Sequence, residues 1–394
     1  MGIPGRGVGT WPQSKVRLGL GKKKGAGSAL WRDGAAAAFR RLTDGRCMRR
    51  LWLHLKPLVS LSDKKRPWGF LVMAALAVGI PTMVGAAVGR FSAGALGSMG
   101  GLVILYMPST AIPHRMVTLA VCSFGFAASF AFGVLTSFNP YLSAATLGMT
   151  AFIVTVITRF FALPPPGSFF FILVACLSRT LPFDLALAPE RVGIVLLGCM
   201  GACLLALGYS VFVKPQAETA ARPPDWHIAA IVLESGLIAV FVGGSYLFAL
   251  LIGLDNPYWV PVSCAAIMQG ATFRAVWHRK VHRIVGTAIG VGVAWAIFSL
   301  PLGPWELALV VTLLSFLIEI LVTRNYGLAV IFITPLTVIF AEAALASANP
   351  SHLMLVRLFD IVIGSSFGYL GGWVVHHPQL FRALEARLKE WRGV

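Results

Sequence analysis

The sequence predicts an all-α polytopic membrane protein with about twelve transmembrane helices in two parallel six-helix repeats. Of its 394 residues, 57% are apolar and 12% are charged, and the mean hydropathy is +0.79. Soluble domains carry about 25% charged residues, so this composition excludes a soluble enzyme. Two further observations, a series of apolar runs and a residue pattern that recurs along the chain, set the expected number and order of the helices.

Twelve apolar runs follow Pro67. Several are close to the roughly 20 residues that a helix needs to cross the hydrocarbon core. The second, fifth and eighth runs are short, which predicts tilted, broken or partly spanning helices. The runs cover 67–89, 93–108, 116–136, 140–161, 167–182, 190–213, 227–254, 258–273, 283–300, 304–323, 326–346 and 353–376.

The same residue types recur 165 or 166 positions apart at matching places in these runs. Because each repeat then holds an even number of spans, both copies have the same orientation in the membrane, as in parallel transporter repeats. The matching pairs are Arg159 with Arg324, Arg191 with Arg357, and Gly198 with Gly364.

The repeats divide the chain into five segments. Residues 1–66 form a basic cytoplasmic tail, which holds 16 of the 33 lysines and arginines and three acids. No nucleic-acid recognition motif occurs in this tail, so its expected partner is anionic membrane lipid and not nucleic acid. The remaining segments are the first membrane repeat 67–213, a short cytoplasmic linker 214–226, the second membrane repeat 227–376 and a cytoplasmic tail 377–394.

The distribution of basic residues between the loops predicts the orientation. Cytoplasmic loops of membrane proteins carry an excess of lysine and arginine. Loops on the same side as the basic tail contain most of the remaining cations, whereas the opposite loops contain Arg90 and little else. We therefore expect a multi-pass protein of the bacterial inner membrane with both termini in the cytoplasm.

The stretch 256–290 combines an apolar run, a dense basic segment and a second apolar run. It opens with Asn-Pro-Tyr-Trp, and its basic segment 274–283 is interpreted as a cytoplasmic loop between two helices. Arg-x-x-Gly-Thr-x-x-Gly follows at 283–290, and small residues of this kind let helices approach closely. Further on, Arg-Asn-Tyr-Gly-Leu-Ala-Val begins at 324 and Phe-Ile-Thr-Pro-Leu begins at 332.

These motifs, in this order, resemble the fusaric acid resistance (FUSC) family of bacterial inner-membrane aromatic acid exporters. The resemblance covers roughly residues 225–375. It implies export of aromatic carboxylic acids, together with a periplasmic adaptor and an outer-membrane channel as partners. The 13-residue linker 214–226 stands where many family members carry a large cytoplasmic domain, so functions of that domain are not expected here. Self-association into a homo-oligomer is left open.

Charged residues inside the apolar runs are the first candidates for function, because burying a charge in a membrane helix costs about 2.5–3.5 kcal/mol on insertion scales. Arg357 and Asp360 form either a self-neutralising pair or a substrate site. Glu234 has no cation close to it in the sequence, which favours proton coupling. Glu319 is either a second proton-coupling acid or an ordinary partner of Arg324 or of the basic segment. Arg179 and Glu342 complete this group.

A second set of candidates lines the expected anion pathway. Guanidinium groups suit carboxylates, so the basic segment predicts either capture of a cytoplasmic anion or topology and lipid-headgroup binding. Pro335 predicts a helix break that binds an anion or a simple kink. The complete predicted pathway set is Arg274, Arg279, Lys280, Arg283, Arg324, Pro335, Arg357 and Asp360.

Motifs for ATP hydrolysis and for zinc-dependent hydrolysis are absent from the sequence, which contains no G-x-x-x-x-G-K-[ST] and no H-E-x-x-H. Its one G-x-S-x-G, at 364–368, lies within the apolar run 353–376 and not at the strand-to-helix turn that a nucleophilic serine requires. Neither an ATPase nor a hydrolase is therefore expected, and no cofactor or metal is predicted. The favoured hypothesis is a secondary transporter that exports organic anions, aromatic carboxylates in particular, using the proton gradient. The alternatives are a passive anion channel and a membrane scaffold or lipid-binding subunit that does not transport.

Overall fold

The computed structural model describes residues 60–213, 220, 222–345, 350–379 and 381, without the side chains of 342–355. Glu342, most of the predicted basic tail, residues 214–219 of the linker and residues 382–394 lie outside this description.

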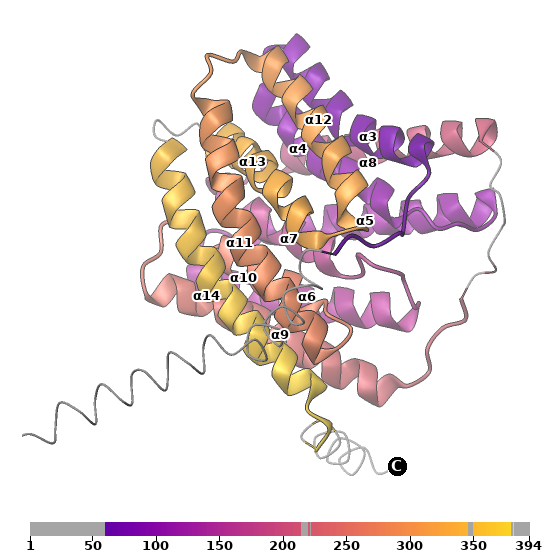
Figure 1. Ribbon diagram of the computed structural model, residues 1–394, viewed down its shortest axis with the longest axis vertical. Helices are drawn as coiled ribbons and strands as arrows, with labels where there is room; N and C mark the ends of the chain where they lie inside the picture. Colours follow the sequence, from indigo (N-terminus) through magenta and orange to yellow (C-terminus); the bar gives the residue numbers. More distant parts are fainter. Residues whose placement is uncertain (1–59, 214–219, 221, 346–349, 380, 382–394) are drawn as a thin grey trace, which may run out of the picture. The chain divides into compact units, whose positions relative to one another are not determined.

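Helices joined by turns make up the described part of the chain, in which no strand occurs (Figure 1). Their order alternates long and short elements, as the apolar runs predict. The elements are α3 (Trp68–Ala87), α4 (Phe91–Gly101) with the 3₁₀ turn η1 (Leu102–Tyr106), α5 (Ile112–Thr136), α6 (Pro140–Phe160), α7 (Phe169–Leu177) with η2 (Ser178–Thr180), α8 (Ala188–Phe212), α9 (Ile228–Leu251), α10 (Trp259–Met268), α11 (Phe273–Phe298), α12 (Pro304–Val322), α13 (Tyr326–Leu345) and α14 (Pro350–His376).

Eight of the described helices are long and apolar enough to cross a membrane: α3, α5, α6, α8, α9, α11, α12 and α14. The other four apolar elements are shorter, namely α4 with η1, α7 with η2, α10 and α13. The prediction of an all-α membrane protein is therefore confirmed, and so is the prediction that the second, fifth and eighth apolar runs form short helices. Twelve complete crossings remain a prediction.

The packing of the helices follows one pattern in both parts of the chain. In residues 68–212, α4 packs against α3 and α8, and α5 packs against α7 and α8. In residues 228–376, α10 packs against α9 and α14, and α11 packs against α13 and α14, which lie side by side in Figure 1. The two helix groups meet where α6 packs on α9 and α12 packs on α3. These partners agree with a repeat, although the two-repeat symmetry itself stays a prediction.

Glycines bring equivalent helices of the two groups into backbone contact. A Cβ added to Gly198 would lie 1.8 Å from the carbonyl oxygen of Gly97, where α8 crosses α4. A Cβ added to Gly364 would lie 2.2 Å from the carbonyl oxygen of Val260 and 2.8 Å from the Cβ of Ser263, where α14 crosses α10. Small residues at these crossings permit the close approach.

The predicted basic loop 274–283 is wrong, because these residues form the first turns of α11. The Thr272 side chain caps the helix by accepting a hydrogen bond from the backbone N–H of Ala275 at 3.2 Å. Lysine and arginine are good helix formers, so the helix continues through the basic segment. The turn between α10 and α11 is confined to residues 269–272.

The predicted break at Pro335 is also wrong, because α13 runs through this proline as one helix. Hydroxyl groups on both sides of it bond back to the helix: Thr334 donates to the carbonyl of Val330 at 2.9 Å and Thr337 to that of Ile333 at 2.7 Å. Membrane helices tolerate proline where such groups and neighbouring helices compensate. The short helices that do end in 3₁₀ turns are α4 and α7.

Candidate functional site

The most deeply buried cation of the second helix group is Arg357, in the first part of α14. Its side chain is 3% exposed, and its guanidinium carbon lies 3.7 Å from the centroid of the Trp259 ring at the start of α10. Its Nη2 donates a hydrogen bond to the Thr337 hydroxyl of α13. Nε and Nη1 are buried and have no hydrogen-bond partner. The aromatic face stabilises the charge, but two donors remain free for a ligand.

Asp360 lies one turn further along α14 and is completely buried. Neither of its carboxyl oxygens has a hydrogen-bond partner. Residues three apart on a helix are neighbours, yet the self-neutralising ion pair between Asp360 and Arg357 is not formed. An unpaired cation and an unpaired acid therefore lie next to each other at the contact of α10, α13 and α14.

A second buried arginine, Arg283 of α11, lies next to the middle of α10. Its Nε donates to the Ser263 hydroxyl at 3.3 Å and its Nη1 to the Tyr326 hydroxyl at 3.3 Å. The guanidinium of Arg279, one turn earlier, lies over the Tyr326 ring at 5.2 Å and donates to the carbonyl of Ala266 at 3.0 Å. Arg279 and Arg283 therefore both contact α10 and α13.

The remaining predicted pathway residues lie apart from this cluster. Arg274 is exposed on the first turn of α11. Lys280 lies over the Tyr369 ring at 4.6 Å and near the Trp277 ring. Arg324 is half-buried, and its backbone carbonyl accepts a hydrogen bond from Ser62 at 2.9 Å. Pro335 lies two residues before Thr337 on α13. The structure thus brings together Arg279 with Arg283, and Arg357 with Asp360.

The three most deeply buried arginines among the described residues have no acidic partner. Ion pairs do join Arg66 with Glu319, Arg90 with Glu190, Arg159 with Glu234 and His227 with Asp225. Arg115, Arg283 and Arg357 are each less than 5% exposed, and they contact hydroxyl groups or a ring instead. Uncompensated buried charge is costly, so these helices favour the approach of an anion.

Both acids predicted to couple protons are paired with arginine. Glu234 of α9 pairs with Arg159 of α6, which the packing of these helices brings within reach. Glu319 of α12 pairs with Arg66, which precedes α3. Arg324 or the basic segment was the predicted partner of Glu319, and this prediction is therefore wrong. Each ion pair lies where one helix group meets the other.

Sequence analysis missed several contributors to the site. Trp259 was visible as part of the Asn-Pro-Tyr-Trp motif, and an aromatic side chain at the head of a short helix was a usable signal. Tyr326 was likewise visible, as part of the Arg-Asn-Tyr-Gly-Leu-Ala-Val motif that begins at 324. Ser263 and Thr337 are ordinary polar residues in apolar runs, and nothing in the sequence distinguishes them. Arg66 was counted among the cations of the basic tail.

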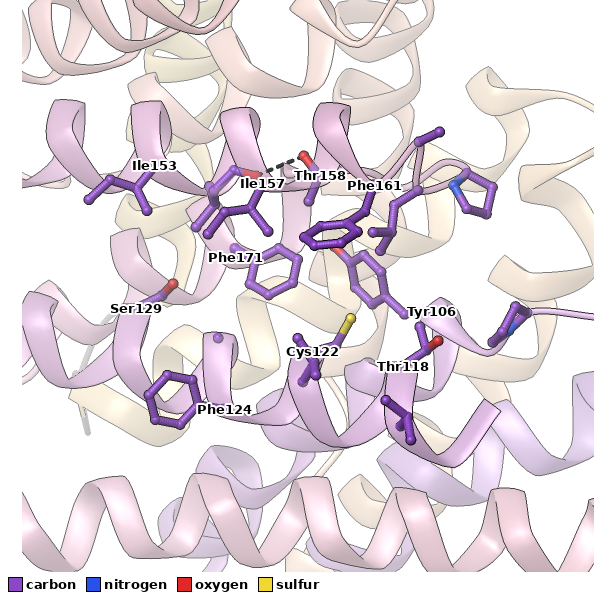
Figure 2. Close-up of a pocket in the computed structure, with 18 of the residues that line it drawn as sticks. Tyr106, Thr118, Cys122, Phe124, Ser129, Ile153, Ile157, Thr158, Phe161 and Phe171 are labelled. Carbon is purple, nitrogen blue, oxygen red and sulfur yellow. Dashed lines mark hydrogen bonds between the residues drawn. The ribbon is translucent and has the colours of Figure 1, made fainter. Parts of the chain in front are cut away.

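A separate apolar groove of about 650 Å³ runs between α5 and α6 (Figure 2). Tyr106 and Phe171 lie within it, in edge and tilted ring contacts with the neighbouring aromatic core. Its polar groups are mainly hydroxyls, and the Thr158 hydroxyl is occupied by the carbonyl of Val154 at 2.7 Å. Its basic residues, His114 and Arg222, are both exposed. The groove therefore suits an apolar chain better than a buried anion.

The motifs that suggested a family fall within the segment that builds the Arg357 cluster. Residues 238–371 match the family model described as fusaric acid resistance protein-like. This match confirms the resemblance predicted from the motifs. The matched segment contains α10, α11, α12, α13 and most of α14, and it therefore includes Trp259, Arg283, Arg357 and Asp360.

Two relatives extend the comparison. The chain is 25% identical over 454 aligned positions to the uncharacterized membrane protein YvaC of Bacillus subtilis (strain 168), covering 77% of this chain and 72% of YvaC. It is 30% identical over 149 positions to the uncharacterized protein YhfK of Escherichia coli (strain K12), covering 37% of this chain and 20% of YhfK. No solved structure matches. The membrane class is thus supported by composition, structure and a relative.

Proposed function

We propose that this protein is a secondary transporter of the bacterial inner membrane that exports organic anions, aromatic carboxylates in particular, and is driven by the proton gradient. The observation that carries the proposal is Arg357, a buried cation with two donor nitrogens that have no acceptor, Nε and Nη1, and with no acidic partner. A guanidinium binds a carboxylate through parallel donors, and an intramembrane charge of this kind marks an ion or substrate pathway.

The substrate class and the partners come from the family. Similarity to fusaric acid resistance protein-like sequences supports aromatic acids as substrates. A periplasmic adaptor, an outer-membrane channel and membrane lipid are the partners that we propose on this basis, with both termini in the cytoplasm. Arg279 and Arg283 contact α10 one or two turns from the Trp259 end, and these contacts support a role for both in passing an anion toward Arg357.

Proton coupling is assigned to Glu234 and Glu319. Each acid pairs with an arginine at a contact between the two helix groups. Protonation of either acid removes its negative charge and releases the arginine. A change in proton binding at these contacts therefore alters how strongly one helix group is held against the other, which is the movement that alternating access requires.

Flux measurements in proteoliposomes test the proposal. Purified protein should move labelled benzoate, with a rate that rises when a pH gradient is imposed. Arg357→Gln should lower this flux at least about tenfold, since losing a charged hydrogen bond costs about 1.5–3 kcal/mol and 1.4 kcal/mol corresponds to a factor of ten. Flux that ignores the pH gradient would indicate a passive anion channel, and absence of flux for a range of carboxylates would indicate a scaffold or lipid-binding subunit.

A further inference from the structure

Asp360 is a buried acid whose charge is stabilised by neither an ion pair nor a hydrogen bond in the structure. It is completely buried, and both of its carboxyl oxygens lack a partner. The groups close enough to act electrostatically on Asp360 or Arg357 are these two residues themselves, Asp255 and Tyr258 ahead of α10, and Arg283 of α11. From α13, the uncharged Thr337 contacts Arg357. None of these groups donates a hydrogen bond to Asp360 in the structure.

The cost of burial determines the charge that Asp360 can carry here. A carboxylate without donors is expensive to bury in its charged form, and such a group takes up a proton instead. The conformation described therefore suits a neutral Asp360 that is not paired with Arg357. When Asp360 loses its proton, the cation best placed to pair with it is Arg357, one turn away on the same helix.

We infer that the substrate carboxylate and Asp360 compete for Arg357, so that one proton binds to Asp360 with each substrate anion. This inference rests on the proposed function. When the anion binds, it takes the place beside Arg357 and a proton from solvent adds to the Asp360 carboxylate. When the anion leaves, Asp360 returns the proton to the side on which the site is open and pairs with Arg357. The net charge of the site is the same in both states.

This stoichiometry distinguishes the proton bound at Asp360 from the protons that drive export. A proton that travels with the anion at Asp360 moves outward during export, so the inward proton gradient cannot drive export through this residue. Protons that drive export have to enter through other acids, and Glu234 and Glu319 are the acids placed at the contacts between the helix groups. Asp360 thus sets the charge of the loaded site, whereas the two glutamates supply the driving force.

Calorimetric titration of benzoate into the purified full-length protein, in two buffers of different ionisation enthalpy, tests the inference. Wild-type protein should take up about one proton per bound benzoate, and its affinity should fall about tenfold per pH unit on the alkaline side, as linkage of one proton requires. Asp360→Asn, which is permanently neutral, should bind benzoate without proton uptake and without this pH dependence. Asp360→Glu should retain the uptake.

The outcomes separate the inference from the proposed function. Benzoate binding by the wild-type protein without proton uptake would overturn the inference alone, and this result does not depend on how any variant folds. The same uptake and pH slope in Asp360→Asn would also overturn it. Absence of binding of benzoate and of other carboxylates would overturn the proposed function and the inference with it. Glu190→Gln, in the exposed pair with Arg90, is the matched control and should behave as wild type.

Discussion

Arg191 and Arg357 occupy equivalent places in the two helix groups and have different surroundings. They are 166 residues apart, and each lies near the start of the last long helix of its group, α8 and α14. Arg191 is half-buried and donates to the carbonyl of Pro182 at 2.7 Å. Arg357 is buried against Trp259 with two free donors. The same residue therefore caps a turn in one group and forms a candidate anion site in the other.

The neighbouring residues explain the difference. Positions 166 residues before Trp259, Ser263, Thr337 and Asp360 are Ala93, Gly97, Phe171 and Ile194. The first helix group thus lacks the ring, the hydroxyls and the acid at these positions. By contrast, the close helix crossings at Gly97 with Gly198 and at Ser263 with Gly364 occur in both groups at the same spacing. The comparison indicates a shared helix scaffold, with the candidate anion site in the second group.

The largest effect is expected from filling these shared crossings. Gly198→Leu and Gly364→Leu should each destabilise the protein by about 1–3 kcal/mol or more, because overpacked contacts cost about this much and the nearest atoms are backbone carbonyl oxygens. Thermal unfolding in detergent measures the change. Gly201→Ala is the control, because no atom lies within 4 Å of an added Cβ there. A large loss in one group with none in the other would contradict the shared scaffold.

The two ion pairs between the helix groups should differ in strength. The Arg66–Glu319 side chains are 26% and 9% exposed, whereas those of Arg159–Glu234 are 50% and 24% exposed. We expect Glu319→Gln to cost roughly 1–2 kcal/mol of stability, and Glu234→Gln to cost well under 1 kcal/mol, as exposed pairs do. Both variants should lower proton-driven efflux while remaining folded.

Unfolding midpoints and efflux at several pH values, measured on the same preparations, test this difference. Unchanged pH dependence of efflux in both variants would remove these acids from the coupling mechanism. Equal destabilisation would show that burial does not distinguish the two contacts.

Removing the Trp259 ring from beside Arg357 should weaken benzoate binding moderately. Trp259→Leu should lower benzoate affinity about 3- to 30-fold, because a cation–π contact of this kind contributes about 0.5–2 kcal/mol and orients the Arg357 guanidinium. Trp305→Leu, at an exposed position of α12, should leave the affinity unchanged. Binding isotherms for the two variants give the comparison, and equal affinities would place the anion away from Trp259.

The smallest effect is expected from the half-buried pair Arg279 and Lys280 of the basic segment. Arg279→Gln with Lys280→Gln should raise the half-saturation concentration of benzoate about two- to threefold and flatten its salt dependence, because steering by partly exposed charges is screened by salt. Chelators should have no effect. Reporter fusions should still place both termini in the cytoplasm, and an inverted topology would assign these residues to orientation instead. An unchanged half-saturation with correct topology would leave them as structural or headgroup contacts.

Much of the helix order was predictable from hydropathy, because the length of each apolar run indicates whether its helix is long or short. Arg357 and Asp360 were also predictable, since charges inside apolar runs are rare. Pairing across helices was not, because the Glu234–Arg159 and Glu319–Arg66 contacts depend on which helices pack together. The error at 274–283 arose because the density of charged residues was interpreted as a loop, although Thr272 is a recognisable helix cap.

Binding of benzoate to wild-type protein, Arg357→Gln and Arg191→Gln, measured by calorimetry in one detergent and buffer, tests the central claim most directly. The two variants remove the same charge from equivalent helices, so a difference between them reports the surroundings of Arg357. We expect Arg191→Gln to bind as wild type does and Arg357→Gln to bind at least about tenfold more weakly. Equal affinities in all three proteins, or a loss confined to Arg191→Gln, would contradict the assignment of the anion site to Arg357.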